Sequence, residues 1–476
     1  MAVQSGRASK MICSPLKPIK IMVSSLKKWN NVCFALGTCI FSLQANAQFT
    51  LSGQLRTRTE LRDGQGSPLP EDAKAAVFTS QRTRLTAGYS WYRLKLGLSL
   101  QDVRVWGQDV STINRTTTQD NNGLMLHEAW AEIGLTDTSF KKGKLSLKVG
   151  RQELIYDDQR LIGNLDWLQQ ARRHDAAVIK YETPKLTLHT GFAFNQNKEN
   201  ASGTKYNATP PGNYPANTNA GSQYKSMEYL YAGYKLKNGS VSYLFFADQF
   251  SQYHTDMVNN TPTKVWDEGV WHRATTGLYA TNNFKNLNVT ASAYYQFGSN
   301  SNGQDLSGAL LSITALYNLN KVFAAGAGYD YTTGGTKDNK SNAFDPLYGT
   351  PHKFWGLMDY FYAASGFGNK GLSDIYIKSK LKAGKSVLLT ADAHQFAAGS
   401  DVYDNNGTLL KRNFGTEADI TCNYTLTKMI SFEAGYSHFW STSTLTSANV
   451  KNVPNAQSNN NWAYLMINIK PEFFKL

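Results

Sequence analysis

The stretch LSGQLRTRTELR, from Leu51 to Arg62, separates into two chemically different faces when it is read with a period of two. One face carries Leu51, Leu55, Thr57, Thr59 and Leu61, and the other carries Ser52, Gln54, Arg56, Arg58, Glu60 and Arg62. Because side chains alternate between the two faces of a β-sheet, this pattern predicts a strand with one apolar face and one charged, hydrated face.

The same alternation recurs to the end of the chain. We predict eighteen strands, near 49–62, 77–90, 92–106, 124–135, 143–151, 171–182, 184–195, 224–237, 239–252, 270–281, 285–298, 307–319, 321–333, 371–382, 385–398, 411–426, 429–441 and 461–471. A soluble sandwich can satisfy such a pattern once or twice. Its repetition therefore predicts an all-β fold, a single transmembrane antiparallel β-barrel with lipid outside and water inside.

The connections between these segments alternate between short and long. The long ones are 63–76, 107–123, 152–170, 196–223, 253–269, 299–306, 334–370, 399–410 and 442–460. Outer-membrane barrels have an even number of strands, short periplasmic turns and long extracellular loops. The alternation predicts a barrel in the outer membrane of a Gram-negative-type bacterium, in contact with its lipid and inserted by the barrel-assembly machinery.

Residues 1–47 have the composition of a secretory signal peptide, with cleavage predicted after Ala47. They contain six basic and no acidic residues, an apolar run at 32–43 and the small-residue sequence Ala45-Asn46-Ala47. The apolar run is too short to span a bilayer as a helix. We therefore expect a barrel domain at 48–476, whose formal net charge falls from +14 to +8 on cleavage.

Several other classes of protein are disfavoured. Cys422 is the only cysteine after residue 47, so the mature chain has neither an internal disulfide nor a cysteine metal site. The eight histidines lack metal-binding spacing and no GxSxG elbow marks a nucleophile, so we expect no enzyme, metal or cofactor. The motifs of nucleic-acid-binding proteins are also missing. A barrel hydrolase with a lumen-edge Ser or Thr beside a His, and an adhesin built on Asn-rich loops, remain open alternatives.

The predicted inward face is rich in cations. Its candidate substrate-binding residues are Arg56, Arg58, Arg82, Arg84, Arg151, Arg160, Arg172 and Arg173, and Lys378, Lys380 and Lys382 follow near the end. A charge that faces lipid at the bilayer midplane costs roughly 2–4 kcal/mol, so these side chains are expected to line the lumen. Guanidinium groups bind carboxylates bidentately, which suits a path for a polyanion. Alternatively, acidic residues such as Glu60 pair with the arginines and brace a wide barrel.

One long connection differs from the others in composition. The stretch FDPLYGTPHKFWGLMDYFYA, at 344–363, is too aromatic for a free loop. We expect it to fold back into the lumen as a constriction. A nineteenth strand is the alternative, although it would break the alternation of long and short connections.

Residues 150–175, GRQELIYDDQRLIGNLDWLQQARRHD, resemble the alginate export family of outer-membrane barrels. The family pattern combines a Gly-Arg-Gln-Glu entry, an acidic-Gln-Arg-Leu-Ile-Gly centre and an Asp-Trp pair, followed by an Arg and an Asp. The Arg-x-Arg opening strand and HKFWGLMD at 352–359 are also similar to the family, and the resemblance extends loosely over the mature chain. The C-terminus departs from the usual aromatic ending, because Phe473-Phe474 is followed by Lys475-Leu476.

The resemblance implies a monomeric, eighteen-stranded barrel with an electropositive pore that passes a polyuronate. By motif it implies contact with the carboxylates of the polymer for Arg56, Arg58, Arg151, Arg160 and Arg172, and for Asp158. We therefore expect an outer-membrane channel for an anionic polysaccharide of the alginate type or for related anionic solutes. A general or small-anion porin is the alternative, and the sequence leaves substrate, transport direction and pore diameter open.

Overall fold

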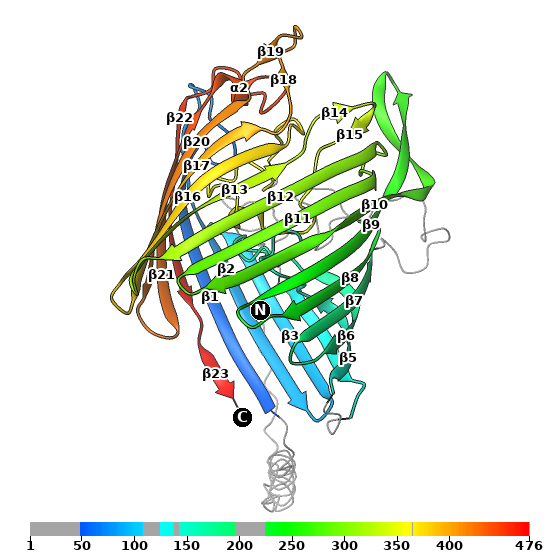
Figure 1. The fold of residues 1–476 in the computed structure, drawn as a ribbon, viewed down its shortest axis with the longest axis vertical. Helices are drawn as coiled ribbons and strands as arrows, with labels where there is room; N and C mark the ends of the chain where they lie inside the picture. The colour runs from blue at the N-terminus through cyan, green and yellow to red at the C-terminus, as the bar shows by residue number, and fades with distance from the viewer. Residues whose placement is uncertain (1–47, 108–123, 138–141, 196–223, 364, 476) are drawn as a thin grey trace, which may run out of the picture. The chain divides into compact units, whose positions relative to one another are not determined.

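The computed structural model describes residues 48–107, 124–137, 142–195, 224–363 and 365–475, which form a barrel of antiparallel strands (Figure 1). The predicted signal peptide at 1–47, the predicted long loop at 107–123 except for residue 107, and the predicted long loop at 196–223 lie outside the described residues. The long strands are β1 (Gln48–Asp63), β2 (Ala76–Trp91), β3 (Leu94–Val105), β4 (Met125–Gly134), β5 (Lys144–Gln152), β6 (His174–Glu182), β7 (Leu186–Phe194), β8 (Ser226–Lys235), β9 (Gly239–Val258), β10 (Thr261–Phe284), β11 (Leu287–Ser299), β12 (Asp305–Asn318), β13 (Phe323–Thr332), β16 (Leu372–Ala383), β17 (Val387–Ala398), β20 (Asn413–Thr425), β21 (Ile430–Ser441) and β22 (Asn459–Ile469).

Short elements decorate the connections between the long strands. They are β14 (Thr336–Lys337), β15 (Lys340–Ser341), β18 (Val402–Tyr403), β19 (Leu409–Leu410), β23 (Glu472–Lys475), the 3-10 helix η1 (Pro351–Lys353) and the helix α2 (Ser443–Thr446). In the part of the chain that the structure describes, no helix is long and apolar enough to cross a membrane, and this result does not bear on crossing by strands.

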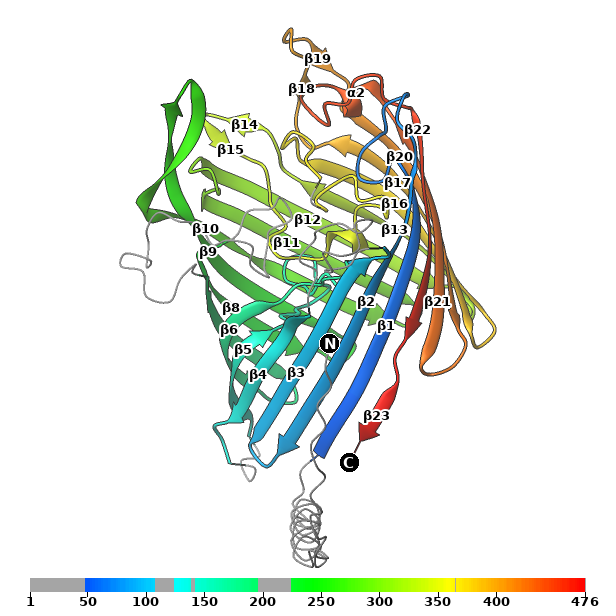
Figure 2. The ribbon, with the colours of Figure 1, turned by 180° about the vertical axis from the view of Figure 1, so that it is seen from behind.

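Pairing of the first long strand with the last one closes the sheet. Each long strand pairs antiparallel with its neighbour in sequence, and β1 pairs with β22 from Leu55↔Ile469 to Asp63↔Asn461. Figure 2 shows β1 between β2 on one side and β22 and β23 on the other. Every long strand therefore has partners on both sides, which is what a spanning sheet requires in lipid.

The predicted fold class is confirmed, because each of the eighteen predicted segments overlaps one of the long strands. One predicted loop is wrong. Most of 253–269 is strand, since β9 runs to Val258 and β10 begins at Thr261, with a turn at Asn259-Asn260. Both turn residues have positive φ, 50° and 60°, as a tight two-residue hairpin requires. The alternation of apolar and polar residues did not predict this extension of β9 and β10, because residues 254–264 are exposed on both faces.

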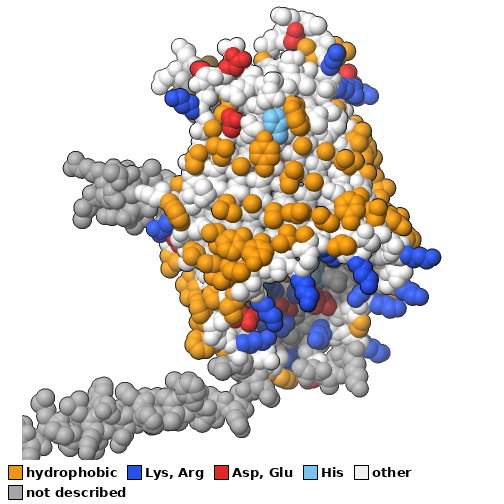
Figure 3. Space-filling view, turned by 90° about the vertical axis from the view of Figure 1, so that its left-hand side faces the viewer, with side chains coloured by type: hydrophobic (Ala, Val, Ile, Leu, Met, Phe, Trp, Pro, Cys, Tyr) orange, Lys and Arg blue, Asp and Glu red, His pale blue; other side chains and the backbone are white. Residues whose placement is uncertain are grey.

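The outer face of the barrel is apolar. The outward side chains of β12 and β16 include Leu311, Ile313, Ile375 and Ile377, each more than half exposed. Figure 3 shows such hydrophobic side chains spread widely over the outer surface. Exposed aliphatic side chains at this density need a membrane to cover them.

Two connections fold inward instead of projecting into solvent. Residues 153–173, between β5 and β6, form the first inward segment, and residues 344–363, between β15 and β16, form the second. The second segment buries Trp355, Met358 and Tyr360 and contains only η1 as regular structure. The predicted inward fold of 344–363 is therefore confirmed, and the nineteenth strand is not formed.

The C-terminus makes a separate contact with β1. Pro471 separates β22 from β23, and β23 pairs with β1 through Leu51↔Phe474 with a shift in register. Phe473 and Phe474 are about half exposed and face outward beside the start of β1. The aromatic pair noted in the sequence thus lies at the junction where the barrel closes.

A lysine placed on the outer face should destabilise the barrel. We expect Ile377→Lys, in the middle of β16, to lower the free energy of unfolding in lipid vesicles by about 2–4 kcal/mol, because the charge meets hydrocarbon. Asn423→Lys, on the inward face of β20, is the matched control and should change it by less than about 1 kcal/mol. Urea-induced unfolding followed by tryptophan fluorescence measures both. Equal effects of the two substitutions would contradict the assignment of the faces.

Candidate functional site

Four arginines of β1 and β2 lie side by side on the inward face. Arg56 is opposite Arg82, and Arg84 is opposite Gln54, in the register of the two strands. Arg56, Arg58 and Arg82 are buried. Since like charges placed directly opposite one another in a sheet repel, this arrangement needs negative groups or hydrogen-bond acceptors close by.

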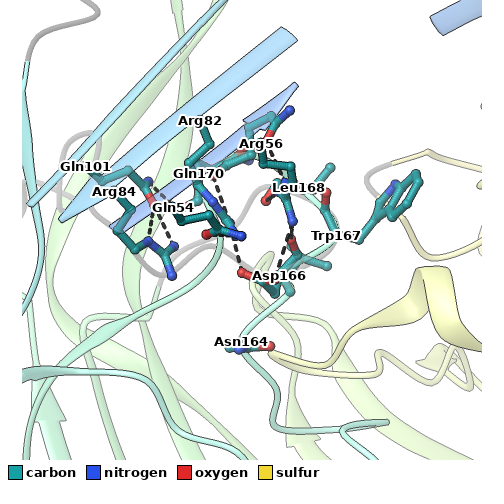
Figure 4. A network of polar contacts seen from close by, with 12 residues as sticks. Gln54, Arg56, Arg82, Arg84, Gln101, Asn164, Asp166, Trp167, Leu168 and Gln170 are labelled. Atoms are coloured by element: carbon teal, nitrogen blue, oxygen red, sulfur yellow. Dashed lines mark hydrogen bonds and ion pairs between the residues drawn. The ribbon is translucent and has the colours of Figure 1, made fainter. Parts of the chain in front are cut away.

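The acceptors come from the first inward segment (Figure 4). Arg56 donates from Nη1 to the backbone oxygen of Asp166 at 2.7 Å and from Nη2 to that of Leu168 at 3.1 Å. Its Nε donates to Oε1 of Gln169 at 2.9 Å. One guanidinium therefore binds three points of an irregular stretch of chain and fixes it against β1.

Asp166 supplies the negative charge between the two strands. Its carboxylate lies 2.8 Å from Nη1 of Arg82 and 3.4 Å from Nη1 of Arg56. Burial raises the pKa of Asp166, but the charge and hydrogen bond of Arg82 and the charge of Arg56 together lower the pKa by more, so that it lies below the ordinary value. Asp166 is consequently ionised throughout the neutral range.

The other two arginines of the pair of strands differ in accessibility. Arg58 donates to Glu60 at 2.8 Å and to the backbone oxygen of Trp167 at 2.8 Å, and it lies 4.2 Å from the centre of the Trp167 ring. Arg84 donates to Oε1 of Gln101 at 2.6 Å. The Arg84 side chain is 14% exposed, against 4% for Arg58, so it is the one that solvent in the lumen reaches.

A buried ion pair ties the first inward segment to another part of the wall. Nη1 of Arg160 lies 2.5 Å from Oδ2 of Asp330 on β13, and both side chains are buried. Asp158 approaches Nε of Arg160 to 3.5 Å, and the ring of Phe354 stacks on the guanidinium at 3.9 Å. Since the same segment is bound to β1 and β2 by Arg56 and Arg82, it spans the lumen.

The second inward segment pairs with the first. The amide of Tyr348 donates to the oxygen of Leu161, and the amide of Gly163 donates to the oxygen of Tyr348, both at 2.9 Å. Arg172 donates to the backbone oxygen of Gly349. These contacts join the two segments into one internal layer.

The second segment is also bound to the wall. Oδ2 of Asp345 lies 2.6 Å from Nη1 of Arg273 on β10. The amide of Met358 donates to Oε1 of Glu417 on β20 at 2.7 Å. The internal layer is thus held by charged side chains from several strands.

Carboxylates dominate a second sector of the wall, formed by β13, β16, β17 and β20. Asp330, Asp374, Glu417 and Asp419 are all buried there. His394 on β17 hydrogen-bonds Asp374 at 2.9 Å and lies 4.0 Å from Asp419. The lumen is therefore polarised, with arginines on β1 and β2 and carboxylates on this sector.

The structure brings eight of the nine sequence-predicted site residues into or beside the first inward segment. They are Arg56, Arg58, Arg82, Arg84, Asp158, Arg160, Arg172 and Arg173. Burial lowers the pKa of Arg172 and of Arg173 to about 10 in each case, which still leaves both charged at neutral pH. The predicted role of these eight residues in contacting a substrate stays a prediction.

Arg151 requires a correction, because it does not reach the lumen. In β5 it has the outward orientation of Val149, which is exposed, while its neighbour Gln152 is buried. Its guanidinium forms a bidentate pair with Asp175 at 2.8 Å, on the outer side of β6. The Gly-Arg-Gln-Glu run lies at the end of β5, and there the side chain of Gln152, not that of Arg151, points inward.

Sequence reasoning missed most partners of the arginines. Asp166 and Gln169 lie within the motif, but nothing in the strand pattern marks them as the groups that receive Arg56. The backbone oxygens of 166–168 carry no sequence signal at all. The acidic sector was visible in part, since Glu417 and Asp419 alternate with apolar residues along β20.

One group of side chains has the composition of a metal site. His127, Glu128 and Glu153 offer ligand atoms within 4.8 Å of one another. Nε2 of His127 is already hydrogen-bonded to Glu153 at 2.8 Å, and Nη1 of Arg84 lies 3.9 Å from the same carboxylate. Because Arg84 compensates Glu153, we interpret the group as an anchor for the start of the first inward segment.

The structure also bears on the hydrolase alternative. In the described residues, no histidine ring is hydrogen-bonded to a serine or threonine hydroxyl. The partners are carboxylates, tyrosines and an asparagine. The arrangement that a serine or threonine nucleophile requires is not formed there.

Comparison with known proteins finds a family model that matches part of the chain and a fold that matches most of it. A family model described as alginate export matches residues 48–197, from β1 through the first inward segment to the end of β7. The resemblance seen in the sequence is thereby confirmed for this part of the chain. No curated protein matches the chain.

Solved structures of barrels from Pseudomonas aeruginosa match almost the whole chain. OpdO has a TM-score of 0.57 and 13% identity and covers 90% of this chain and 98% of its own. The outer membrane protein OpdK has a TM-score of 0.55 and 10% identity, with coverages of 90% and 99%. OpdQ has a TM-score of 0.54 and 14% identity, with coverages of 90% and 98%. At these identities the likeness is one of fold.

Fold, outer surface and family match agree on the class of the protein. The chain is a porin-like barrel of the outer membrane, and its location and fold class were predicted correctly. The family model that matches residues 48–197 describes export, and the fold is that of porin-like barrels.

Removal of the Arg56 guanidinium should loosen the first inward segment. We expect Arg56→Met to expose backbone amides of 164–170 to hydrogen exchange and to raise the single-channel conductance, because three acceptors lose their donor. Unsatisfied buried acceptors cost about 1–3 kcal/mol each. The control is Arg412→Met, which removes a half-exposed pair with Asp401 on the surface. Unchanged exchange in 164–170 would show that Arg56 does not hold the segment.

A pH dependence is expected where three connections meet at the extracellular end. Lys451 donates to the backbone oxygens of Gly66 at 2.9 Å and Tyr360 at 2.5 Å, and burial lowers the pKa of its ammonium group to about 7. A folded pKa below the ordinary value of about 10.4 means that docking is opposed by protonation and is favoured as pH rises above 7.

Hydrogen exchange tests this dependence directly. After correction for the intrinsic rate, protection of the amides at 447–453 should increase between pH 6 and pH 9. Lys451→Met, which keeps the aliphatic chain and removes the titrating group, should abolish the increase. A profile that does not change with pH in the parent protein would rule out titration of Lys451 in this range.

Proposed function

We propose that this outer-membrane channel passes an anionic polysaccharide, a polyuronate of the alginate type. One observation carries the proposal. Four guanidinium groups, those of Arg56, Arg58, Arg82 and Arg84, gather on two adjacent strands, and the carboxylates that contact them are fewer: Glu60, Glu153 and Asp166. The family match, which covers this cluster and the first inward segment, supports the same substrate class.

The bonding of the arginines suggests how a polyanion would be received. Most of their hydrogen-bond acceptors are neutral, either backbone oxygens of the first inward segment or side-chain oxygens of glutamines. A uronate carboxylate is a stronger acceptor for a guanidinium than a neutral carbonyl and matches its planar geometry. The polymer would therefore compete for donors that now hold the segment, so that passage and displacement of the segment are coupled.

Accessible cations would make the first contact. Arg84 faces the lumen from β2, and Lys353 is exposed on the second inward segment, where the charges of Asp158 and Asp166 act on it. We assign the buried Arg56, Arg58, Arg82, Arg160 and Arg172, together with Arg173 and Asp158, to contacts made after the segment moves. Each contact can be weak, as passage requires.

A porin for small anions is the second candidate. The internal layer formed by the two inward segments narrows the lumen. The carboxylates on the sector formed by β13, β16, β17 and β20 line another part of the barrel wall. A polarised and narrow lumen also suits a small anion that carries polar groups. The presence or absence of block by a polymer separates the two candidates.

The maturation and state of the protein belong to the same proposal. We infer that residues 1–47 are removed as a signal peptide and that the barrel-assembly machinery inserts 48–476. The closed pairing of β1 with β22 supports a functional monomer, because the barrel needs no second chain to complete it.

Planar-bilayer recording tests the proposed function. The parent protein should give an anion-selective reversal potential in a salt gradient and should be blocked by micromolar alginate oligomers. The double variant Arg84→Gln/Lys353→Gln should weaken the block at least about fivefold, since each lost charge removes about 0.5–1.5 kcal/mol. Arg412→Gln, a surface cation on the extracellular loop, is the control.

The possible outcomes separate the candidates. Anion selectivity without block by alginate oligomers would favour the small-anion porin. Cation selectivity would mean that the arginines are neutralised by their internal partners, and it would overturn both candidates.

A further inference from the structure

Two buried carboxylates in the sector formed by β13, β16, β17 and β20 lack the close arginine or histidine partner that other buried carboxylates have. Glu417 and Asp419 have no lysine or arginine nitrogen within 4.0 Å in the part of the chain that the structure describes. The other buried carboxylates of that part each lie 2.5–2.9 Å from a nitrogen of an arginine or a histidine. They are Glu60, Asp248, Asp330, Asp359 and Asp374.

These two carboxylates lie close together and have free oxygen atoms. Glu417 and Asp419 occupy alternate positions of β20, so both side chains point into the barrel, where they are 0% and 4% exposed. Their carboxyl groups lie within hydrogen-bonding reach of each other. Oε1 of Glu417 accepts the amide of Met358, but its Oε2 and both carboxylate oxygens of Asp419 are buried without a hydrogen-bond partner among the described residues. Three carboxylate oxygens thus share a buried place without a donor. 

A neutral side chain on the neighbouring strand is an independent observation at the same place. Ser437 lies directly opposite Asp419 in the register of β20 and β21, so the two side chains share the inward face. Ser437 is fully buried, and its hydroxyl approaches Asp419 but forms no hydrogen bond of normal geometry with any described residue. Because buried hydroxyl groups are ordinarily hydrogen-bonded, this one indicates that a ligand belongs between the two strands.

The second inward segment covers this group of oxygens. Gly356 has a positive φ of 78°, and a Cβ atom at this position would overlap with Oε2 of Glu417. The backbone of the segment therefore passes directly over the carboxylate, which only a glycine allows. The carboxylate is closed off from water in the lumen, so solvent does not compensate its charge.

The negative charge of the pair requires a positive partner, because an uncompensated charge is very costly to bury. A proton shared between the two carboxyl groups would still leave one negative charge. His394 does not remove that charge, since its Nδ1 is bonded to Asp374 at 2.9 Å and its Nε2 stays 4.0 Å from Asp419. A divalent cation would compensate both carboxylates at once.

The ligand atoms favour one kind of cation. Carboxylate and hydroxyl oxygens are hard ligands, which suit Ca²⁺ and Mg²⁺ better than a transition metal. Ca²⁺ takes about 6–8 oxygens in a flexible geometry and accepts bidentate carboxylates, whereas Mg²⁺ demands a near-ideal octahedron. Since both oxygens of Asp419 are free, the group suits Ca²⁺.

We propose that Glu417, Asp419 and Ser437 form a binding site for a Ca²⁺ ion on the inner wall of the barrel. The bound ion joins β20 to β21. It also compensates the carboxylate that receives the amide of Met358, so it fastens the second inward segment to the wall. Sites of this kind in extracellular proteins bind Ca²⁺ with a Kd of about 0.1–1 mM. The inference does not depend on which solute the channel passes.

The test is the Tm of the barrel in EDTA and in millimolar CaCl₂. The protein is refolded in detergent without outer-membrane lipid, so that no ion bound to headgroups contributes, and unfolding is followed by tryptophan fluorescence. Ca²⁺ should raise the Tm of the parent protein by at least about 2 °C, because a ligand that binds only the folded state stabilises it. MgCl₂ at the same concentration should raise the Tm by less than half as much, because its octahedral geometry is not met.

Matched variants assign the response to this site. Asp419→Asn should abolish the response to Ca²⁺, and its Tm in EDTA should equal or exceed that of the parent protein, because the repulsion between two carboxylates is gone. Asp392→Asn is the control, since it removes a carboxylate of the same sector that is already paired with Lys378 at 3.2 Å, and it should keep the full response. Glu128→Gln alters the group around His127 and should keep the response as well.

Terbium luminescence locates the bound ion. Tb³⁺ occupies oxygen-lined Ca²⁺ sites and is excited by energy transfer from a nearby tryptophan, and Trp355 directly precedes Gly356 in the chain. The parent protein should show sensitised emission that CaCl₂ displaces. Asp419→Asn, Ser437→Ala and Trp355→Phe should each lose most of this emission, whereas Asp392→Asn should keep it.

Two results would overturn the calcium site. A parent protein with the same Tm in EDTA and in CaCl₂ would mean that the two carboxyl groups share a proton instead. A response that is lost in Glu128→Gln and kept in Asp419→Asn would place the ion at the group around His127. Neither result bears on the polyuronate channel, which is tested by block with alginate oligomers, and absence of block would leave the calcium site standing.

Discussion

A backbone amide or carbonyl in hydrocarbon must find its hydrogen-bond partner within the protein, and closure of β1 onto β22 is how this chain meets that constraint. The number of strands and the alternation of side chains follow from it. Once every strand is paired on both sides, the outward face needs only apolar side chains, and the inward face is free to carry charge. Because successive strands run up and down, they are joined alternately by short turns at one end of the barrel and by long connections at the other.

The same constraint explains the arginines. Irregular chain is tolerated at membrane depth only where it is surrounded by protein or water and its polar groups are satisfied. The first inward segment exposes carbonyl oxygens that have no strand partner, and Arg56, Arg58 and Arg82 supply donors to them. A guanidinium offers five donors in a fixed plane, so a few side chains satisfy a long stretch of backbone. Groups that hold the segment are also the groups best suited to bind a uronate.

The fold could be predicted from local periodicity in the sequence, whereas the details of the site depend on contacts between residues far apart in the chain. Alternation in Leu51–Arg62 depends on neighbours two residues apart, so it is legible in a single sequence. The contact of Arg56 with Asp166 joins residues more than a hundred positions apart, and its acceptors include backbone atoms that any residue possesses. Arg151 was misplaced because its charge was expected inside, although alternation along β5 puts it in the phase of Val149. Its bidentate pair with Asp175, which satisfies the guanidinium on the outer side, is a contact that the sequence does not show. The strand extension beyond Gln252 was invisible because water bathes both of its faces.

The hairpin at Asn259-Asn260 has a consequence for how this barrel is used as a scaffold. Its two strands continue the pairing of β9 and β10 beyond the barrel, and residues 254–264 are exposed around the turn. A guest peptide spliced between the two asparagines would lengthen only this ribbon, because the register below is already set by Arg273↔Asp248 and the pairs that follow. This two-stranded ribbon is thus a suitable insertion site for displaying an epitope on the bacterial surface, because it is remote from the lumen and its charges.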